Sequence, residues 1–194
     1  MNFMDKKIID MLMEDLDQSR LEHTLRVVEE AKRLARRYDV DIQKATTAAL
    51  LHDCGKLKDN NNLLKLADDF DIMMTDNKDL IHAPLGAALA QHKYKIEDED
   101  ILNAIKYHTT GRKDMSHLEK IIYIADYIEP NRKFIGVERV RRLAFEDLDE
   151  SICLAMDQTI VFLVKSNRII SLDTIEARNQ LVSKGNKGGS QWAK

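Results

Sequence analysis

A histidine and an aspartate stand side by side at the end of an apolar segment of the chain. His52 and Asp53 follow Leu50 and Leu51 directly. Consecutive side chains of a helix point about 100° apart, so an imidazole and a carboxylate placed here converge only on something local, such as a cation. An ionised carboxylate beside an apolar helix is costly unless it is paired or bound to a metal. The pair therefore predicts a metal site, although a histidine next to a capping aspartate also explains it.

A second carboxylate lies in apolar surroundings. Asp126 interrupts the stretch Ile121 to Ile128, which we expect to be the most apolar helix of the chain. A carboxylate in such a helix needs a cation, and Arg132 and a bound metal are the two candidates. The simpler interpretation is a buried salt bridge.

His23 adds a third element, just before the apolar positions of another predicted helix begin at Leu25. On its own it would be interpreted as a surface or capping histidine. The order His23, then His52-Asp53, then Asp126, on three separate predicted helices, favours a shared centre instead. Imidazole and carboxylate ligands together suit iron, manganese or zinc.

These residues must be positioned by helices, because the chain has only seven glycines and two prolines to break regular structure. Apolar residues at three-and-four spacing predict an amphipathic helix over 21–38. Asp41 is expected to cap a helix that runs to His52, and Gly55 to supply a left-handed residue after it. Further helices are expected from Pro84 to 92, from Asp98 to 108, from a capping box at 116–119 to 129, over 137–145 and 149–165, and from about 173. The polar stretch 58–79 is expected to connect elements flexibly near a site, with a short helical interior at 63–66.

The bulk properties are those of one ordinary globular domain of 194 residues with a net charge of −3. This charge gives no reason to expect a nucleic-acid or membrane partner. Cys54 and Cys153 have no metal-binding or disulfide spacing, and we found no signal segment, so a cytoplasmic protein is expected. The sequence thus predicts an all-α fold with a single domain over residues 1–182 and a loose polar tail over 183–194.

Five blocks of this sequence, at 20–27, 50–56, 81–87, 104–111 and 124–132, resemble in order the YqeK branch of the HD-domain metal-dependent phosphohydrolases. A further block at 173–179 extends the resemblance. The resemblance implies a single HD-domain helical bundle. It also implies a symmetrical bis(5'-nucleosyl)-tetraphosphatase, which splits diadenosine tetraphosphate into two ADP.

The resemblance also implies roles for individual residues. It makes His23, His52, Asp53 and Asp126 the metal ligands, with iron as the expected metal and manganese, cobalt or zinc as possible substitutes. One or two ions are expected, because HD proteins with intervening histidines such as His82 and His108 resemble a two-metal subset in which the Asp of the pair bridges both ions. Its substrate contacts map to His23, Asp53, Cys54, Gly55, Lys56, His82, His108, Thr109, Asp126, Arg132, Ile169, Ile170, Ser171, Leu172, Asp173 and Thr174.

One segment departs from the family pattern. Many members have His-Pro where this chain has Ser171-Leu172 before Asp173-Thr174. Backbone contacts to the nucleoside can survive that change, but no side-chain contact is carried over for residue 171.

The expected reaction is attack of water on a phosphoanhydride, for which a metal lowers the pKa of water. Lys56 and Arg132 would supply further positive charge to the phosphates, and His82 or His108 could protonate the leaving oxygen. Lys56 is equally well explained as a cation at a helix C-terminus. The arginines at 139, 141 and 142 are interpreted as a solvated face.

Two other classes stay open at this point: an HD enzyme for another nucleotide, and a non-catalytic nucleotide-binding regulatory module. The complete set of four ligands argues against the second class. The expected partner is a small dinucleotide, and a homodimer is possible.

Overall fold

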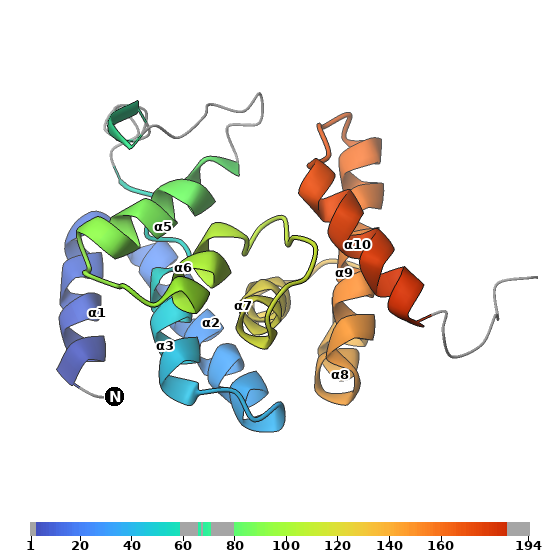
Figure 1. Ribbon diagram of the computed structural model, residues 1–194, viewed down its shortest axis with the longest axis horizontal. Helices are drawn as coiled ribbons and strands as arrows, with labels where there is room; N and C mark the ends of the chain where they lie inside the picture. Colours follow the sequence, from blue (N-terminus) through green and yellow to red (C-terminus); the bar gives the residue numbers. More distant parts are fainter. Residues whose placement is uncertain (1–2, 59–65, 67, 71–79, 186–194) are drawn as a thin grey trace, which may run out of the picture.

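The computed structural model describes residues 3–58, 66, 68–70 and 80–185, and all regular structure within this part of the chain is helical (Figure 1). The expected all-α class is therefore confirmed. The helices are α1 (Phe3–Asp15), α2 (Gln18–Arg37), α3 (Ile42–Leu51), α5 (His82–His92), α6 (Glu99–Lys106), α7 (His117–Ile128), α8 (Val137–Glu146), α9 (Leu148–Lys165) and α10 (Leu172–Gly185).

Local capping chemistry sets several helix starts where the sequence predicted them. The side chain of Asp41 accepts hydrogen bonds from the backbone N–H groups of residues 43 and 44, and Asp98 does the same for α6. Ser116 accepts from the N–H of Glu119. The expected capping box is only half formed, because the Glu119 carboxylate pairs with Arg112 instead of turning back to the helix start.

Three features differ from the sequence-based expectations. Helix α1 was not predicted, and α5 begins at His82, two residues before Pro84. The expected left-handed conformation at Gly55 is wrong, since the described glycines with positive φ are Gly111 and Gly136. Gly55 serves a tertiary purpose: a Cβ there would lie 2.2 Å from the carbonyl oxygen of His82, so only glycine lets the two segments approach.

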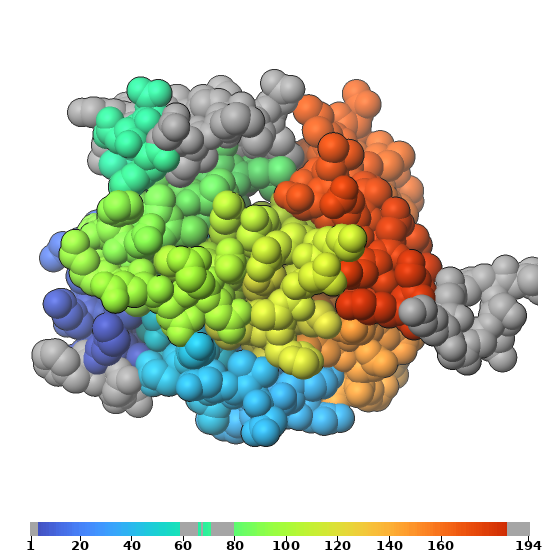
Figure 2. Space-filling model, viewed as in Figure 1, coloured from blue at the N-terminus to red at the C-terminus, as the bar shows by residue number. Residues whose placement is uncertain are grey.

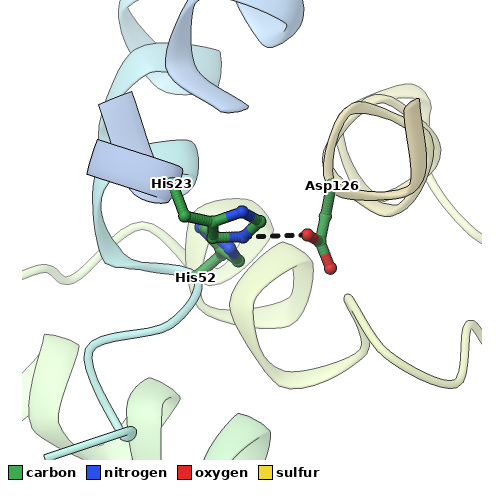
Figure 3. A group of neighbouring side chains, drawn as sticks. All are labelled: His23, His52 and Asp126. Atoms are coloured by element: carbon green, nitrogen blue, oxygen red, sulfur yellow. Dashed lines mark ion pairs between the residues drawn. The ribbon is translucent and has the colours of Figure 1, made fainter. Parts of the chain in front are cut away.

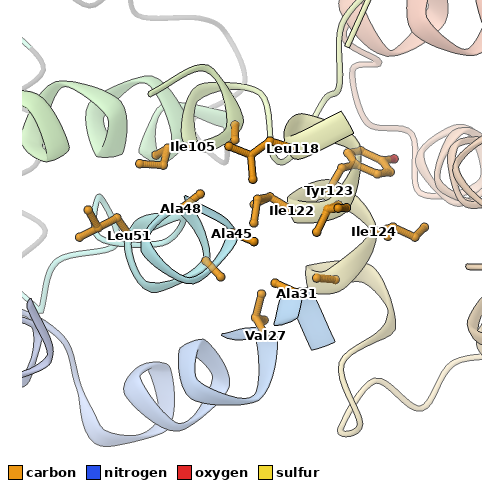
Figure 4. Packing of buried hydrophobic residues seen from close by; sticks show 14 of the residues in the cluster. Val27, Ala31, Ala45, Ala48, Leu51, Ile105, Leu118, Ile122, Tyr123 and Ile124 are labelled. Atoms are coloured by element: carbon orange, nitrogen blue, oxygen red, sulfur yellow. The ribbon is translucent and has the colours of Figure 1, made fainter. Parts of the chain in front are cut away.

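Helices α3 and α7 form the centre of the bundle, where Ala45 of α3 faces Ile122 of α7 (Figure 4). Ala45, Ala48 and Leu51 of α3 are fully buried, as are Ile122 and Ile124 of α7. Helix α3 packs against α1, α2, α5, α6 and α7. Because alanine allows close helix approach, α2, α3 and α7 bring the ends that carry the candidate site residues into one place.

The C-terminal helices form a second group beside α7. Helix α9 packs against α7, α8 and α10, and α10 lies against the segment that follows α6 (Figure 2). Thr174 of α10 donates a 2.9 Å hydrogen bond to the carbonyl oxygen of Thr110. Because α10 continues to Gly185, the expected boundary at residue 183 falls inside a helix.

Some expectations concern residues outside the described part. Residues 186–194 of the expected tail and most of the expected connection at 58–79, including its helical interior, belong to this group. Among the described helices, none combines the length and the apolar character needed to cross a membrane.

Candidate metal centre

The four predicted metal ligands lie together in the structure, although they come from separate helices. His23 belongs to α2, His52 caps α3 and Asp53 follows it, and Asp126 lies in the last turn of α7. The side chains of His23, His52 and Asp126 point toward one another, and Nε2 of His23 lies 3.0 Å from Oδ1 of Asp126 (Figure 3). His52 and Asp53 are essentially inaccessible to solvent.

Asp53 is the centre of the cluster, and its two carboxylate oxygens face different histidines. Oδ2 lies 3.5 Å from Nε2 of His52 and 3.8 Å from Nε2 of His23. Oδ1 lies 3.4 Å from Nε2 of His82 and 3.4 Å from Nε2 of His108. One carboxylate thus connects two groups of possible ligands, which is the arrangement that a bridging aspartate requires.

Backbone contacts fix the tautomers of two of these histidines. Nδ1 of His52 lies 2.7 Å from the carbonyl oxygen of Ala49, and Nδ1 of His108 lies 2.7 Å from that of Ile105. A carbonyl oxygen only accepts, so both Nδ1 atoms carry hydrogen and both Nε2 atoms can present a lone pair. These Nε2 atoms are the ones that face Asp53.

A buried nitrogen without a hydrogen bond also fits a metal ligand at this site. Within the described residues, Nε2 of His52 is buried and makes no hydrogen bond. Leaving such an atom unsatisfied costs about 1–3 kcal/mol. His23, His52 and Asp126 form one group of donors with spacing suited to an ion, and His52, Asp53 and His108 form another. The donor set and its geometry therefore fit a metal ion.

The electrostatics of the cluster keep the ligands in their metal-binding forms. Burial lowers the pKa of His52 to about 4, so the ring is neutral near pH 7. Burial alone would raise the pKa of Asp53, but His52, His108 and Lys56 outweigh it and hold this pKa well below its usual value. The pKa of Asp126 is likewise lowered, against burial, by His23, His52 and Arg132.

Three cationic side chains surround the carboxylates. Nζ of Lys56 lies 3.0 Å from Oδ1 of Asp53, and Nη1 of Arg20 lies 2.9 Å from Oδ2 of the same residue. Nη2 of Arg132 lies 2.7 Å from Oδ1 of Asp126. All three are partly exposed, so they can also reach an anion that enters from solvent. The sequence led us to expect Arg132 or a metal as the cation beside Asp126, and Arg132 forms an ion pair with it.

The segment that carries Cys54 and Gly55 is fixed against α5. Cys54 is buried and its Sγ donates to the carbonyl oxygen of Gly86 at 3.3 Å. Together with the close approach of Gly55 to His82, this contact sets the distance between the residues after α3 and the start of α5.

The segment expected to hold a nucleoside lies outside the metal cluster. Ile169 and Leu172 are exposed, and Ile170 and Ser171 are half-buried. A hydrogen bond links this segment to the neighbourhood of the cluster: the hydroxyl of Thr174 donates to the carbonyl oxygen of Thr110. Thr110 lies two residues after His108 in the chain.

Sequence reasoning missed Arg20 and the pair Arg26 and Glu129. Arg20 lies one helical turn before His23 and on the same face, which was a usable signal. Glu129 lies in the Glu-Pro-Asn-Arg block after Asp126, but nothing in the sequence shows that it turns toward α2.

The interpretation of residues 139, 141 and 142 as a solvated face is wrong for Arg141, which donates to the carbonyl oxygens of Ile128, Glu129 and Arg132.

Comparisons with known proteins agree with this picture. Residues 20–131 match the HD domain family. The chain is 45% identical over 180 residues to a protein of Halalkalibacterium halodurans named symmetrical bis(5'-nucleosyl)-tetraphosphatase, covering 91% of this chain and 96% of the relative. A Bacillus subtilis protein of the same name is 42% identical over 88% of this chain and 93% of its own length.

A solved structure resembles the whole bundle. It is that of a Clostridium acetobutylicum protein described as an HD superfamily hydrolase involved in NAD metabolism. The two chains are 44% identical and superpose with a TM-score of 0.87, covering 92% of this chain and 97% of the other.

Proposed function

The chain belongs to the HD domain family and, within it, to the symmetrical tetraphosphatases of the YqeK group, and we propose from this that it hydrolyses diadenosine tetraphosphate to two ADP. The observation that carries the proposal is the buried carboxylate of Asp53 between two groups of imidazoles, paired with the partly exposed cations Lys56 and Arg20. A tetraphosphate bridge is strongly anionic, so it suits a site that combines metal ligands with Lys56 and Arg132.

The proposed metal is held by His23, His52, Asp53 and Asp126. Iron is the metal we propose, with manganese, cobalt and zinc as substitutes, because mixed imidazole and carboxylate ligands suit these ions. A second ion would be held by Asp53 with His82 and His108. When bound, such an ion supplies a Lewis acid that lowers the pKa of water and offsets charge on phosphoryl oxygens.

The remaining residues bind the substrate and move a proton. Arg132 can grip a phosphate with two parallel N–H donors, and Lys56 supplies a compact charge on the same side. When they do not hold a second ion, His82 and His108 face the site through Nε2, and a proton carried on that atom could pass to the leaving oxygen. Residues 54–55 and 109 border the phosphates, and residues 169–174 border the nucleoside.

The proposal also covers the cellular compartment of the protein and its partner. Cys54 and Cys153 are free thiols, which suits a reducing cytoplasm. The partner is a small dinucleotide, and the proposed enzyme needs no nucleic acid or membrane.

The test is hydrolysis of diadenosine tetraphosphate in ¹⁸O-labelled water, with the purified protein loaded with Fe, Mn, Co or Zn. Ion exchange and mass spectrometry should give two ADP, one of which carries a single ¹⁸O on its terminal phosphate. Formation of ATP and AMP, or no cleavage with any of these metals, contradicts the proposal. Parallel assays with dAMP and cyclic di-AMP test for an HD enzyme of different specificity.

A further inference from the structure

Glu129 is a buried carboxylate that lies directly behind His23. It is the C-cap residue of α7 and only 3% exposed. Its Oε1 lies 3.5 Å from Nδ1 of His23, and its Oε2 accepts from Nε of Arg26 at 2.8 Å and from the backbone N–H of Asn131 at 2.9 Å. Burial opposes ionisation, but these donors and His23 hold the pKa of Glu129 below its usual value.

The Nδ1 environment of His23 differs from that of the other two histidines whose Nδ1 contacts are described above. His52 and His108 each face a neutral backbone carbonyl through Nδ1, whereas His23 faces an ionised carboxylate. A carboxylate at this position favours the tautomer with hydrogen on Nδ1 and makes Nε2 a stronger electron donor. Nε2 of His23 is the atom that faces Asp126 and Asp53.

Glu129 also contacts the residue that is proposed to bind phosphate. Its backbone carbonyl accepts from the N–H of Arg132 at 2.9 Å, and its Oε1 lies 3.9 Å from Nε of Arg132. The same residue therefore orients a proposed metal ligand on α2 and the turn after α7 that presents Arg132.

We propose that Glu129 is a positioning residue of the metal centre: it fixes the Nδ1–H tautomer of His23 and raises the affinity of the site for a divalent metal. The inference rests on the metal centre proposed above. Arg26, one helical turn after His23 on α2, keeps the carboxylate in place.

Glu119 provides a matched control for Glu129. It lies in α7, which Glu129 caps, is 2% exposed, and pairs with an arginine, Arg112, as Glu129 pairs with Arg26. Glu119 is not among the residues that surround Asp53. Glu119→Gln should therefore reproduce the structural cost of removing a buried charge without affecting the metal.

The experiment is titration calorimetry of metal-free wild type, Glu129→Gln and Glu119→Gln with Mn²⁺, with folding checked by circular dichroism. We expect Glu129→Gln to weaken Mn²⁺ binding by about 10–100-fold, as outer-shell partners commonly do, and Glu119→Gln to change it by less than about twofold. Equal affinities in the two variants overturn the inference while the metal centre stands. Absence of Mn²⁺ binding to the wild type overturns both.

A measurement on the wild type covers the case in which Glu129→Gln does not fold. In the Zn²⁺-loaded protein, ¹⁵N NMR of the imidazole rings should show hydrogen on Nδ1 of His23 and metal on Nε2. The signal is assigned by its loss in His23→Gln. Hydrogen on Nε2, or metal on Nδ1, overturns the inference.

Discussion

The Nε2 atoms of His82 and His108 lie 3.2 Å apart. Because Nδ1 of His108 is engaged by the carbonyl of Ile105, its Nε2 is an acceptor in the neutral ring, and a proton or cation must lie between the two imidazoles. This pair lies beside the four proposed ligands of the first metal, not among them. It is therefore suited to exchange a proton with a phosphate oxygen.

We expect His82→Gln and His108→Gln to keep the first bound metal and to lower kcat by about 10²-fold or more, the usual effect of losing a general acid. Metal content per chain, measured by mass spectrometry, and kcat test this together. His92→Gln is the control, because His92 is exposed at the end of α5 and stacks on Phe70. A variant that loses the first metal as well would make the histidine a ligand of that metal.

Asp53→Ala should abolish both metal binding and turnover. The substitution removes the carboxylate that every histidine of the cluster faces and leaves Arg20 and Lys56 without their shared partner. We expect metal content near zero after dialysis and kcat below about 10⁻³ of wild type, in line with the loss of an essential catalytic group. Full activity in this variant would falsify the metal mechanism.

Arg132→Lys should weaken phosphate binding while keeping the positive charge. A lysine cannot make two parallel hydrogen bonds, and losing a charge-assisted bond of about 1.5–3 kcal/mol corresponds to roughly 10–100-fold in kcat/KM. Arg142→Lys, on the exposed face of α8, should leave kcat/KM unchanged. Equal kinetics for the two variants would remove Arg132 from the substrate site.

Gly55→Ala should destabilise the protein, since the new Cβ would lie 2.2 Å from a backbone oxygen of His82. We expect a loss of about 1–3 kcal/mol in the free energy of unfolding, typical of overpacking, and a lower kcat because His82 must shift. Gly185→Ala serves as the reference, because nothing lies within 4 Å of its Cβ position. Urea denaturation of both variants is the measurement; similar midpoints would contradict the steric argument.

The metal-free protein should lose stability as the pH falls below 6.5. The pKa of His52 is lowered from 6.5 to about 4 by burial, so between these values the unfolded chain takes up a proton that the folded chain does not. At about 1.4 kcal/mol per pH unit, the loss between pH 6.5 and 4 is about 3 kcal/mol. Denaturation of metal-free wild type at pH 7 and 5 measures the part of this loss above pH 5, about 2 kcal/mol, and His52→Gln should show a smaller difference. An equal difference in the variant would assign the effect to other groups.

The clustering of the proposed ligands could be predicted from the sequence because most of them are polar residues at or near apolar helices. His52, Asp53 and Asp126 stand out for this reason, and helix caps such as Asp41 depend only on neighbouring residues. Glu129 could not be identified in this way, since charged residues are common on helices and only the packing of α2 against α7 places it behind His23. Arg20 could have been found only from its helical spacing to His23. Gly55 was misinterpreted because its role depends on the approach of α5, a segment about thirty residues away in the chain.

Helix α10 packs on α9 and makes polar contacts with the segment between α6 and α7. Thr174 bonds to Thr110, and Gln180 bonds to Asp114. The proposed nucleoside segment at 169–174 thus lies on a helix that has no packing contact with α2, α3 or α7 among those described. In the proposed enzyme, changes in this segment, Ser171-Leu172 among them, would alter base preference without replacing a proposed metal ligand.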